Sequence, residues 1–552
     1  MGERTISRRN FLAGLTATGA LAAAGALAGC APRAQAEGGK SGKADADAQG
    51  SWRDKPEMPA DIAETLEADL VVVGAGNGGL VAATTAAQNG AKVIVLEKGG
   101  NIAAAREAIG ALNSALEPDH VEDVPTLLNH ANQTQAGDAN MLLYKTWAEK
   151  SGEMIEWMKE TLEPKGMLFP FEWHKPDDPH AYYPAMCYNP CMGEYNPDGP
   201  NYGAYAHLEV MNEVLGELGG EVMLMTPAKM LVQDESGKVT GVIAESKDKG
   251  VIQINAKNGV IVCTGGYGAN DEMLQDLCPG NSNWCVLRDS VTEEGDGIRM
   301  ALWAGAEMQE GPFPTALHPQ RWADPSSNQL EGPFLYVTEQ GKRFFNEGTW
   351  VQARSLQIMQ NTADDCAYSI FDASWPEDLL DSFSAGGGMF WDMFREKGSS
   401  TYQTTVEYYR ESIEKYLDSV YFKADSLEEL AKKIGVPADE FVATVERYNQ
   451  LCANGYDEDF HKAKQFLYPI DTPPYYASKV GAVLLVVVGG VRVNTNLQCI
   501  NAEGAGVQGL YAVGNVSGDI HAVDYPINVP GNSHGRALTQ GYLVGRTLAG
   551  VE

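Results

Sequence analysis

Two short stretches near the N-terminal end constrain the fold most, because each pairs an apolar run with a distinctive ending. Residues 70–79 read Leu-Val-Val-Val-Gly-Ala-Gly-Asn-Gly-Gly, and residues 93–98 read Val-Ile-Val-Leu-Glu-Lys. This order predicts a buried strand, a tight glycine turn, a helix and a second strand, which together form a dinucleotide-binding βαβ unit. We expect a pyrophosphate on the helix N-terminus, where free N–H groups and the helix dipole favour anions.

The residue types in this unit each have an expected role. Gly74 permits the turn, Gly76 lets the backbone approach the pyrophosphate, and Gly79 lets the helix pack closely on the strand. Glu97 ends the second strand and can accept hydrogen bonds from adenosine ribose hydroxyls. The flanking strands and the distal acid favour nucleotide binding over a purely structural glycine turn.

The N-terminus has the features of an export signal. Ser7-Arg8-Arg9-Asn10-Phe11-Leu12 is a twin-arginine pattern, and an Ala-rich apolar region follows it. Residues 27–30 read Leu-Ala-Gly-Cys, which resembles a lipobox, so residues 1–30 predict an exported protein that is lipid-anchored at Cys30 on the outer face of the cell membrane. The alternative is a plain signal peptide with an incidental cysteine. Residues 31–65 have few large apolar side chains and predict a disordered tether.

Charge and cysteine usage exclude several classes. The 552 residues carry a formal net charge of −33, which argues against nucleic-acid binding because a polyanion would be repelled. Cys187 and Cys191 form a C-x₃-C pair without a second pair, so free thiols are favoured over a disulfide or a metal site. Haem-attachment, iron–sulfur and zinc-protease motifs are missing from the sequence, and we expect no metal.

The rest of the chain predicts one domain interrupted by another. Residues 222–254 alternate in polarity around a turn at 234–238, which predicts an antiparallel hairpin. Apolar runs at 259–263 and 509–513 both lead into glycines and predict further parallel strands. We therefore expect an α/β, Rossmann-like domain in two segments, 66–307 and 485–552, with an inserted α+β capping domain at 308–484.

Seven motifs carry a family resemblance across residues 68–550. They read Val-Val-Gly-Ala-Gly-Asn-Gly-Gly at 72–79, Leu-Glu-Lys at 96–98, Thr-Gly-Gly-Tyr at 264–267, Gly-Asp-Gly at 295–297, Gly-Lys-Arg-Phe-Phe-Asn-Glu at 341–347, Gly-Gly-Val at 489–491 and Gly-Leu-Tyr-Ala-Val-Gly-Asn at 509–515. The chain resembles the flavoprotein family of soluble fumarate reductases, urocanate reductases and 3-ketosteroid dehydrogenases. The resemblance implies bound FAD, a mobile cap, and a substrate held against the flavin at the domain boundary. Residues 101–109 lack the histidine of covalently linked relatives, which implies non-covalent FAD.

The resemblance also implies a set of cofactor-binding positions along the dinucleotide. These are Gly74, Gly76, Asn77, Gly78, Gly79, Glu97, Lys98, Asn113, Ala228, Thr264, Gly265, Gly266, Asp296, Gly514, Asn515, Gly531, Asn532 and Ser533.

The departures from the family concern the anion clamp of fumarate reductases. The His-His-Thr-Met segment is replaced by residues 485–488, Leu-Val-Val-Val, and the His-Pro-Thr segment reads Phe313-Pro314-Thr315. The cap arginine falls at Val351, with Arg354 three residues further on. Burying a carboxylate beside Val486, Val351 and Phe313 would cost several kcal/mol. We therefore reject fumarate and succinate, and expect a neutral and bulkier substrate.

Tyr525 is the first candidate for the catalytic acid or carbonyl polariser, because Tyr525-Pro526 resembles a Tyr-Pro-Gly segment of ketosteroid dehydrogenases. Arg354, Tyr336 and His521 are further candidates, and each of the four has a packing role as its alternative. Weaker candidates are Tyr182, Tyr183, Tyr205, His207 and His318.

Three functions remain open. The first is an exported reductase that transfers a hydride from flavin N5 to an enone, an aromatic acrylate or a steroid-like small molecule. Because no second redox centre is visible in the sequence, its electrons would come from an external quinol-linked, cytochrome or flavoprotein donor. The second is a ketosteroid-type dehydrogenase that runs the reaction in reverse, and the third is a surface flavoprotein that only binds a ligand.

Overall fold

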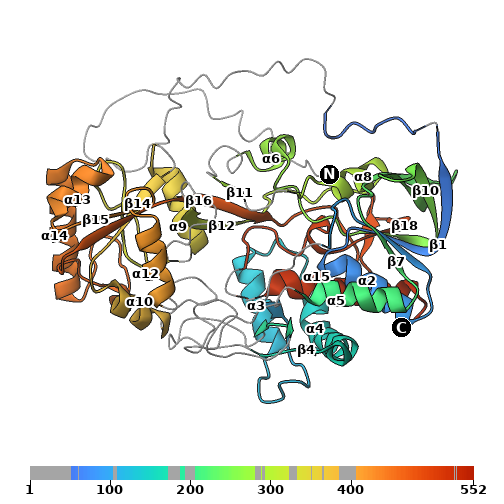
Figure 1. Ribbon diagram of the computed structural model, residues 1–552, viewed down its shortest axis with the longest axis horizontal. Coiled ribbons are helices and arrows are strands. Elements are labelled where there is room, and N and C mark those ends of the chain that lie inside the picture. The colour runs from blue at the N-terminus through green and yellow to red at the C-terminus, as the bar shows by residue number, and fades with distance from the viewer. Residues whose placement is uncertain are drawn as a thin grey trace, which may run out of the picture. The chain divides into compact units, whose positions relative to one another are not determined.

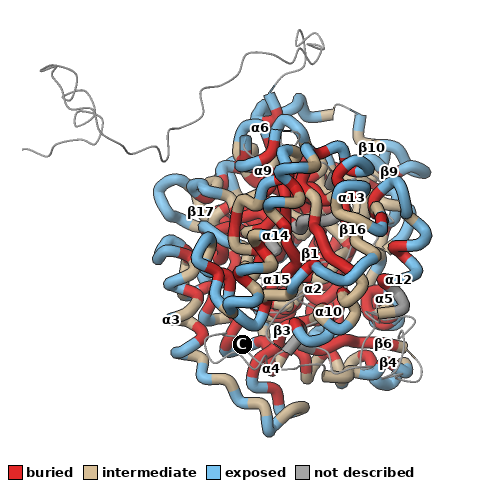
Figure 2. Tube along the Cα trace, turned by 90° about the vertical axis from the view of Figure 1, so that its left-hand side faces the viewer, coloured by how far each residue is buried: buried red, intermediate tan, exposed pale blue. Residues whose placement is uncertain are grey.

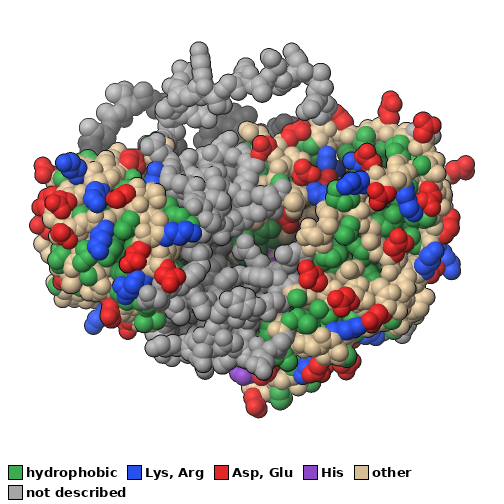
Figure 3. All heavy atoms as spheres, viewed as in Figure 1, with side chains coloured by type: hydrophobic (Ala, Val, Ile, Leu, Met, Phe, Trp, Pro, Cys, Tyr) green, Lys and Arg blue, Asp and Glu red, His purple; other side chains and the backbone are tan. Residues whose placement is uncertain are grey.

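The computed structural model describes residues 51–551, apart from 60, 103–107, 172–186, 193–205, 280–286, 289–291, 322–331, 350, 364–365, 385–405, 527–528 and 530. The twin-arginine pattern, Cys30, Tyr182, Tyr183 and Tyr205 lie outside the described residues. Within them, the helices are too short or too polar to cross a lipid bilayer. Acidic side chains are scattered over the face shown in Figure 3, which agrees with the net charge of −33.

A mostly parallel sheet forms the larger domain (Figure 1). Its strands, in spatial order, are β17 (Gln498–Ile500), β18 (Gly506–Ala512), β10 (Gly250–Val262), β1 (Glu64–Val73), β2 (Val93–Leu96) and β7 (Glu221–Met223). β1 runs parallel to both β10 and β2, and β10 runs parallel to β18. The prediction of a parallel nucleotide-binding sheet built from distant segments is confirmed.

The helices of this domain cover the sheet, and buried residues of β1, α2 and α15 form much of the hydrophobic core (Figure 2). They are α2 (Asn77–Gln88), α3 (Val124–Thr134), α4 (Met141–Leu162), α5 (His207–Glu217), α6 (Asp271–Leu277), α8 (Asp296–Trp303) and α15 (Asn532–Leu548). α15 packs closely on α2 because Gly541 and Gly545 lack side chains. A Cβ on Gly541 would lie 2.3 Å from the Gly78 carbonyl oxygen.

The predicted hairpin is present at the expected turn. β8 (Ala228–Gln233) pairs antiparallel with β9 (Val239–Ser246), and β9 pairs antiparallel with β10. The Asp234 carboxylate closes the turn by accepting the backbone N–H groups of Ser236 at 2.9 Å and Lys238 at 3.1 Å. Short strands elsewhere are β3 (Ile109–Gly110) with β5 (Cys187–Tyr188), and β4 (Met167–Leu168) with β6 (Cys191–Met192).

The capping domain is built on one long strand, β16 (Tyr475–Val487). Its partners are β11 (Leu287–Arg288), β12 (Thr315–Arg321), β14 (Cys366–Phe371) and β15 (Tyr421–Ala424), and β13 (Leu335–Val337) pairs with β14. The helices are α9 (Val351–Asn361), α10 (Trp375–Ser384), α12 (Val406–Lys415), α13 (Leu427–Ile434) and α14 (Ala438–Asn454). β16 crosses the boundary predicted at 484/485, and β11 belongs to the cap sheet although it lies before 308. The apolar run from Ala482 to Val487 lies within one strand, so the sheet does not stop at the domain boundary.

The tether predicted for 31–65 is wrong at its C-terminal end. The Trp52 side chain is only 6% exposed, and its indole Nε1 donates to the Asp276 carboxylate at 3.1 Å. The Arg53 guanidinium forms an ion pair with Asp276 at 2.7 Å. The backbone carbonyl oxygen of Arg53 accepts the Trp303 indole N–H at 3.0 Å. One buried tryptophan contributes enough apolar area to fix a polar segment to α6 and α8.

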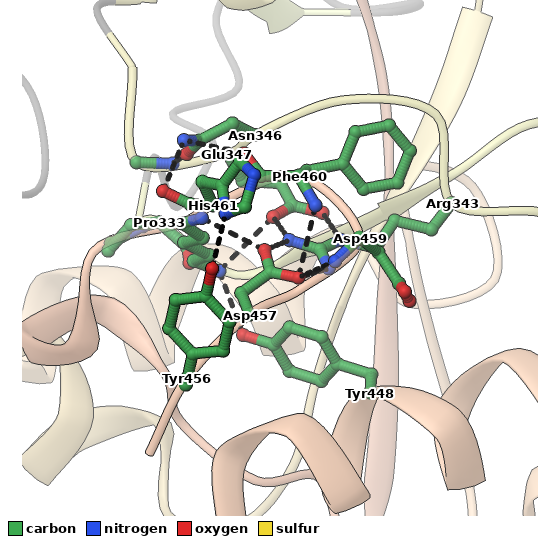
Figure 4. Close-up of polar contacts among 12 residues, drawn as sticks. Pro333, Arg343, Asn346, Glu347, Tyr448, Tyr456, Asp457, Asp459, Phe460 and His461 are labelled. Carbon is green, nitrogen blue, oxygen red and sulfur yellow. Dashed lines mark hydrogen bonds and ion pairs between the residues drawn. The ribbon is translucent and has the colours of Figure 1, made fainter. Parts of the chain in front are cut away.

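A buried charge cluster in the cap joins the 341–347 motif to the loop after α14 (Figure 4). The Arg343 guanidinium bonds Glu347 at 2.8 Å and Asp457 at 2.7 Å, and all three side chains are at most 6% exposed. The Lys462 ammonium lies 3.3 Å from Glu347 and donates to the Tyr448 hydroxyl at 2.8 Å. Burial lowers the pKa of Lys462 to about 8 despite the neighbouring Glu347.

We expect Asp457→Asn to lower the free energy of unfolding by about 3 kcal/mol at pH 7, because it leaves a buried guanidinium short of one carboxylate. Burial alone would raise the pKa of Asp457, but hydrogen bonds from Arg343 and from two backbone N–H groups lower it to about 2. The wild type therefore loses this stabilisation as the pH falls from 4 towards 2, and the two proteins converge there. Urea unfolding between pH 2 and 7 measures the difference.

Asp459→Asn is the matched control for this change. Asp459 pairs with Arg447 at 2.7 Å on the surface, where its side chain is 33% exposed, so its loss should cost at most about 1 kcal/mol. Equal losses for the two variants would contradict the view that the buried cluster stabilises the cap.

Candidate active site

A cavity of about 580 Å³ opens at the carboxyl ends of β1, β2, β10 and β18, where α2 and α15 begin. Figure 1 labels these strands and helices. Ligands of open α/β sheets bind in such crevices. The cavity is lined by Val73, Gly74, Gly76, Asn77, Gly78, Leu96, Glu97, Lys98, Gly99, Asn101, Leu208, Pro227, Ala228, Cys263, Thr264, Gly265, Thr292, Glu293, Asp296, Leu485, Val486, Val513, Gly514, Asn515, Tyr525, Ser533, His534 and Ala537.

The glycine turn leaves one end of this cavity bare. Gly74 has φ +106°, and a Cβ there would lie 2.5 Å from the Cys263 carbonyl oxygen. A Cβ on Gly79 would lie 1.9 Å from the Gly74 carbonyl oxygen, whereas one on Gly76 would meet nothing within 4 Å. The N-terminus of α2 has no side-chain cap, so its first N–H groups are available to an anion. This cradle fits a pyrophosphate.

Acidic side chains form another part of the cavity wall. The Glu97 carboxylate accepts the backbone N–H groups of Ala75 at 3.0 Å and Gly99 at 2.7 Å, which fixes it at the end of β2. The Lys98 ammonium pairs with Asp296 at 2.9 Å and with Glu294 at 3.1 Å. Burial disfavours the charge on Lys98, but these two carboxylates outweigh it and raise the pKa of the lysine.

The lining also includes two aliphatic side chains and an aromatic hydroxyl. Leu485 and Val486 extend from β16, and the half-buried Tyr525 lies on the loop before α15. Buried Gln135 holds that loop, because its side-chain oxygen accepts the N–H of Ala522 at 2.8 Å and its amide donates to the Asp524 carbonyl at 2.7 Å. The described lining contains three acids and one paired lysine, but no arginine.

Most of the predicted cofactor positions meet at this cavity. Those that line it are Gly74, Gly76, Asn77, Gly78, Glu97, Lys98, Ala228, Thr264, Gly265, Asp296, Gly514, Asn515 and Ser533. Gly79, Gly266, Gly531 and Asn532 lie outside the lining. At Gly531, for example, φ is +69° and a Cβ would lie 2.4 Å from the Ala108 carbonyl oxygen, so this glycine permits close packing.

Asn113 lies outside the described lining of the cavity. Its side chain is exposed and exchanges two hydrogen bonds with the Glu122 backbone, at 2.7 and 3.0 Å. The residue has φ +52°, a left-handed conformation that Asn tolerates.

The structure brings only one of the four catalytic candidates, Tyr525, to the cavity. The placement predicted for Arg354 and Tyr336 is wrong. Arg354 is 2% exposed within the cap and donates to the carbonyl oxygens of Thr349 at 3.0 Å and Gly332 at 3.3 Å. Tyr336 is fully buried against Phe345, with ring centroids 5.5 Å apart. Cap helices and strands point these side chains into the cap core, which a matching sequence position does not specify.

The fourth candidate, His521, lies behind the cavity wall at 1% exposure, with its ring centroid 6.3 Å from that of Tyr525. Burial holds the pKa of His521 well below its usual range, and the positive charge of Arg536 lowers it further. Phe313 also lies outside the lining and packs edge-on against Tyr267 at 6.4 Å. The side chains of Val351 and His318 lie outside the described residues, and His207 bonds the Asn77 amide oxygen at 3.0 Å.

Several residues of the site were missed, including Thr292 and Glu293 of the lining. Leu208 and His534 line the cavity, and Arg536 lies directly behind it. Leu208 lies on the apolar, buried face of α5, and nothing in such a pattern separates a core position from a cavity wall. Residues 534–536, His-Gly-Arg, have the polarity of an exposed helix and gave no signal of their own.

Buried polar atoms behind the wall agree with a bound flavin. Asn532 is 3% exposed, and neither atom of its side-chain amide has a hydrogen-bond partner among the described residues. Buried amides are normally paired, so such a group next to a cavity indicates a ligand or a water. The pyrophosphate cradle, Glu97 and this amide together fit a flavin dinucleotide.

Comparisons with known proteins agree with this geometry. The family model described as "FAD binding domain" matches residues 69–525. The vinyl phenol reductase of Lactiplantibacillus plantarum is 27% identical over 507 residues, covering 87% of this chain and 96% of that protein. The fumarate reductase (cytochrome) of Shewanella frigidimarina is 27% identical over 518 residues, covering 90% and 80%. The structure of 3-ketosteroid delta1-dehydrogenase from Sterolibacterium denitrificans with 1,4-androstadiene-3,17-dione shares the fold, with TM-score 0.67, 20% identity, and coverage of 88% and 99%.

Proposed function

The chain belongs to the FAD binding domain family and is an FAD-dependent oxidoreductase acting on C–C or C=C groups, and on that premise we propose that it reduces a neutral conjugated alkene. The observation that carries the proposal is the described cavity lining, which includes Leu485, Val486 and Tyr525 and contains no arginine. A dicarboxylate would meet Glu293 there without a cationic partner, and burying it unpaired would cost several kcal/mol.

FAD bound along the glycine cradle supplies hydride exchange at N5 of the flavin. The chain itself excludes water from the substrate and supplies the proton for the reduction. Leu485 and Val486 present apolar surface to the substrate. The Tyr525 hydroxyl donates a hydrogen bond to the carbonyl oxygen that conjugates with the double bond, which in a vinyl phenol is the oxygen of its quinone-methide tautomer. This hydrogen bond stabilises the negative charge that develops on the oxygen when hydride adds, and Tyr525 then gives its proton to that oxygen.

The names of the relatives limit the choice of substrate. One relative is named for vinyl phenol and another for fumarate, and each is 27% identical to this chain, so identity does not decide between them. The cavity lining favours the neutral, aromatic alternative. The reverse reaction, in which the enzyme introduces a double bond as a ketosteroid dehydrogenase does, uses the same groups and is favoured by the likeness in fold.

The cellular setting follows from the sequence alone. Residues 7–12 and 27–30 support export by the twin-arginine route and lipid anchoring at Cys30, on the outer face of the membrane. Because the sequence carries no haem or iron–sulfur motif, electrons reach the flavin from a separate donor, which is a quinol-linked, cytochrome or flavoprotein partner. A lipid anchor keeps the enzyme close to such a donor.

We expect the photoreduced enzyme to be reoxidised quickly by an enone or a vinyl-substituted phenol, and at least about tenfold more slowly by fumarate. Anaerobic stopped-flow absorbance of the flavin measures both rates. An enzyme that fumarate reoxidises as fast as the neutral compounds would overturn the proposal. Reduction of the flavin by a saturated ketosteroid, with no turnover of alkenes, would establish the reverse reaction instead.

A further inference from the structure

Arg536 is a buried cation behind the cavity wall. It lies on the second turn of α15 and is 0% exposed. Its guanidinium donates to the Gly514 carbonyl oxygen at 2.9 Å and to the Asn515 side-chain oxygen at 2.7 Å. Among the described residues its Nε has no partner, and none of its nitrogens forms an ion pair. The positive charge is therefore held by two neutral oxygens.

The groups around Arg536 do not neutralise it. His521, at 1% exposure, stays uncharged because of its burial and the adjacent guanidinium. Asn532 is neutral, and the phenolate form of Tyr525 would favour the charge on Arg536. Burial lowers the pKa of Arg536 to about 10, which still leaves it protonated at neutral pH.

A buried charge without a counter-ion is strongly destabilising unless an anion approaches it. Both groups that hold the guanidinium, Gly514 and Asn515, line the cavity, so the charge lies one hydrogen bond from the lumen. The N-terminus of α15 contributes Ser533, His534 and Ala537 to the same wall, and its dipole adds to the positive potential there. A low-dielectric wall screens this field poorly.

We propose that Arg536 stabilises the negative charge that the flavin gains on reduction, and so sets the midpoint potential of the enzyme. Two electrons from the external donor and one proton enter the oxidised flavin, which then carries one negative charge, and the guanidinium balances it. Arg536 acts through Gly514 and Asn515 and is a positioning residue. The inference rests on FAD as the cofactor but not on the choice of substrate.

The wild-type enzyme provides the first test. A couple that takes up two electrons and one proton shifts by about 30 mV per pH unit, because a tenfold change in proton concentration is one tenfold change in a two-electron equilibrium. We expect this slope between pH 6 and 8. A slope of about twice that value, which means uptake of two protons, would overturn the proposal without any variant.

Two variants separate charge from packing. Arg536→Met removes the charge, and we expect a midpoint potential about 30 mV more negative, which is a tenfold change in the equilibrium. Sulfite forms a bond to flavin N5 and pushes the electron pair into the pyrimidine half, so its affinity should also fall at least about tenfold. Arg536→Lys keeps the charge and should stay within about threefold of wild type in both measurements.

Arg546→Met is the control on the same helix. Arg546 pairs with Glu153 at 2.7 Å and is 27% exposed, so its loss should change neither the potential nor the affinity for sulfite. Unchanged values in Arg536→Met would overturn the inference. If that variant does not retain FAD, the wild-type slope and Arg536→Lys decide the question. No organic substrate enters these measurements, so failure here leaves the proposed alkene reduction intact, whereas a protein without flavin would refute the premise itself.

Discussion

Replacing Tyr525 by Phe is expected to slow reduction of a conjugated substrate by about 100- to 10,000-fold, because the change removes the cavity-lining hydroxyl that we assign as proton donor. The ring stays in place, so the FAD content and the substrate KM should change much less than kcat. Single-turnover reoxidation of the reduced flavin, recorded against pH, measures the effect and shows whether an ionisation of the wild type is lost.

Tyr336→Phe is the matched control for this prediction. Its hydroxyl is also removed, but Tyr336 is fully buried in the cap and lies outside the cavity lining, so turnover should stay within about threefold of wild type. An unchanged rate in Tyr525→Phe would exclude Tyr525 as the acid. A large loss in Tyr336→Phe would show that the cap core acts on the chemistry.

Gly76→Val is expected to weaken FAD binding by about 10- to 100-fold. A Cβ at this position meets nothing within 4 Å, so the fold accepts the side chain, but the valine occupies the space that a pyrophosphate needs. Losing one charge-assisted hydrogen bond to a phosphate corresponds to about 1.5–3 kcal/mol. Titration of the apoprotein with FAD, followed by flavin fluorescence, measures the affinity.

Gly216→Val separates binding from folding. Gly216 lies near the end of α5, and a Cβ there also meets nothing within 4 Å, but it does not line the cavity. Its FAD affinity should equal that of wild type, and the urea midpoints of both apoproteins should stay close to the wild-type value. Tight FAD binding by Gly76→Val would refute the assignment of the glycine turn as the phosphate cradle.

Local signals in the sequence were sufficient for much of the fold. The strand–glycine–helix unit at 70–97 is encoded by neighbouring residues, since Gly74 must adopt φ +106° and the apolar runs must be buried. The break between α13 and α14 is equally local, because Gly435 ends one helix in a left-handed conformation and Pro437 precedes the next. Such features depend on few distant contacts and can be predicted.

Features that depend on distant partners could not be predicted in this way. Trp52 is fixed by acids more than 200 residues away, at Glu272 and Asp276. Arg354 occupies a helix in the cap, and only the packing of that helix determines that its guanidinium points to backbone carbonyls instead of the cavity. Arg536 has the sequence context of a surface residue and is buried only because α15 packs against the turn at Gly514. Side-chain direction is a tertiary property.

A conjugated carboxylic acid and its methyl ester form the most direct test of the central claim, that this cavity accepts a neutral substrate. The two compounds share the conjugated carbon skeleton but differ in charge and in intrinsic reactivity, so the ratio of their rates is divided by the ratio measured with free reduced flavin, and the quotient reports the electrostatics of the cavity. We expect the ester to reoxidise the photoreduced enzyme at least about tenfold faster than the acid, because the described lining offers a carboxylate no arginine. An acid that reacts faster than its ester, with a rate that falls on adding salt, would contradict the account.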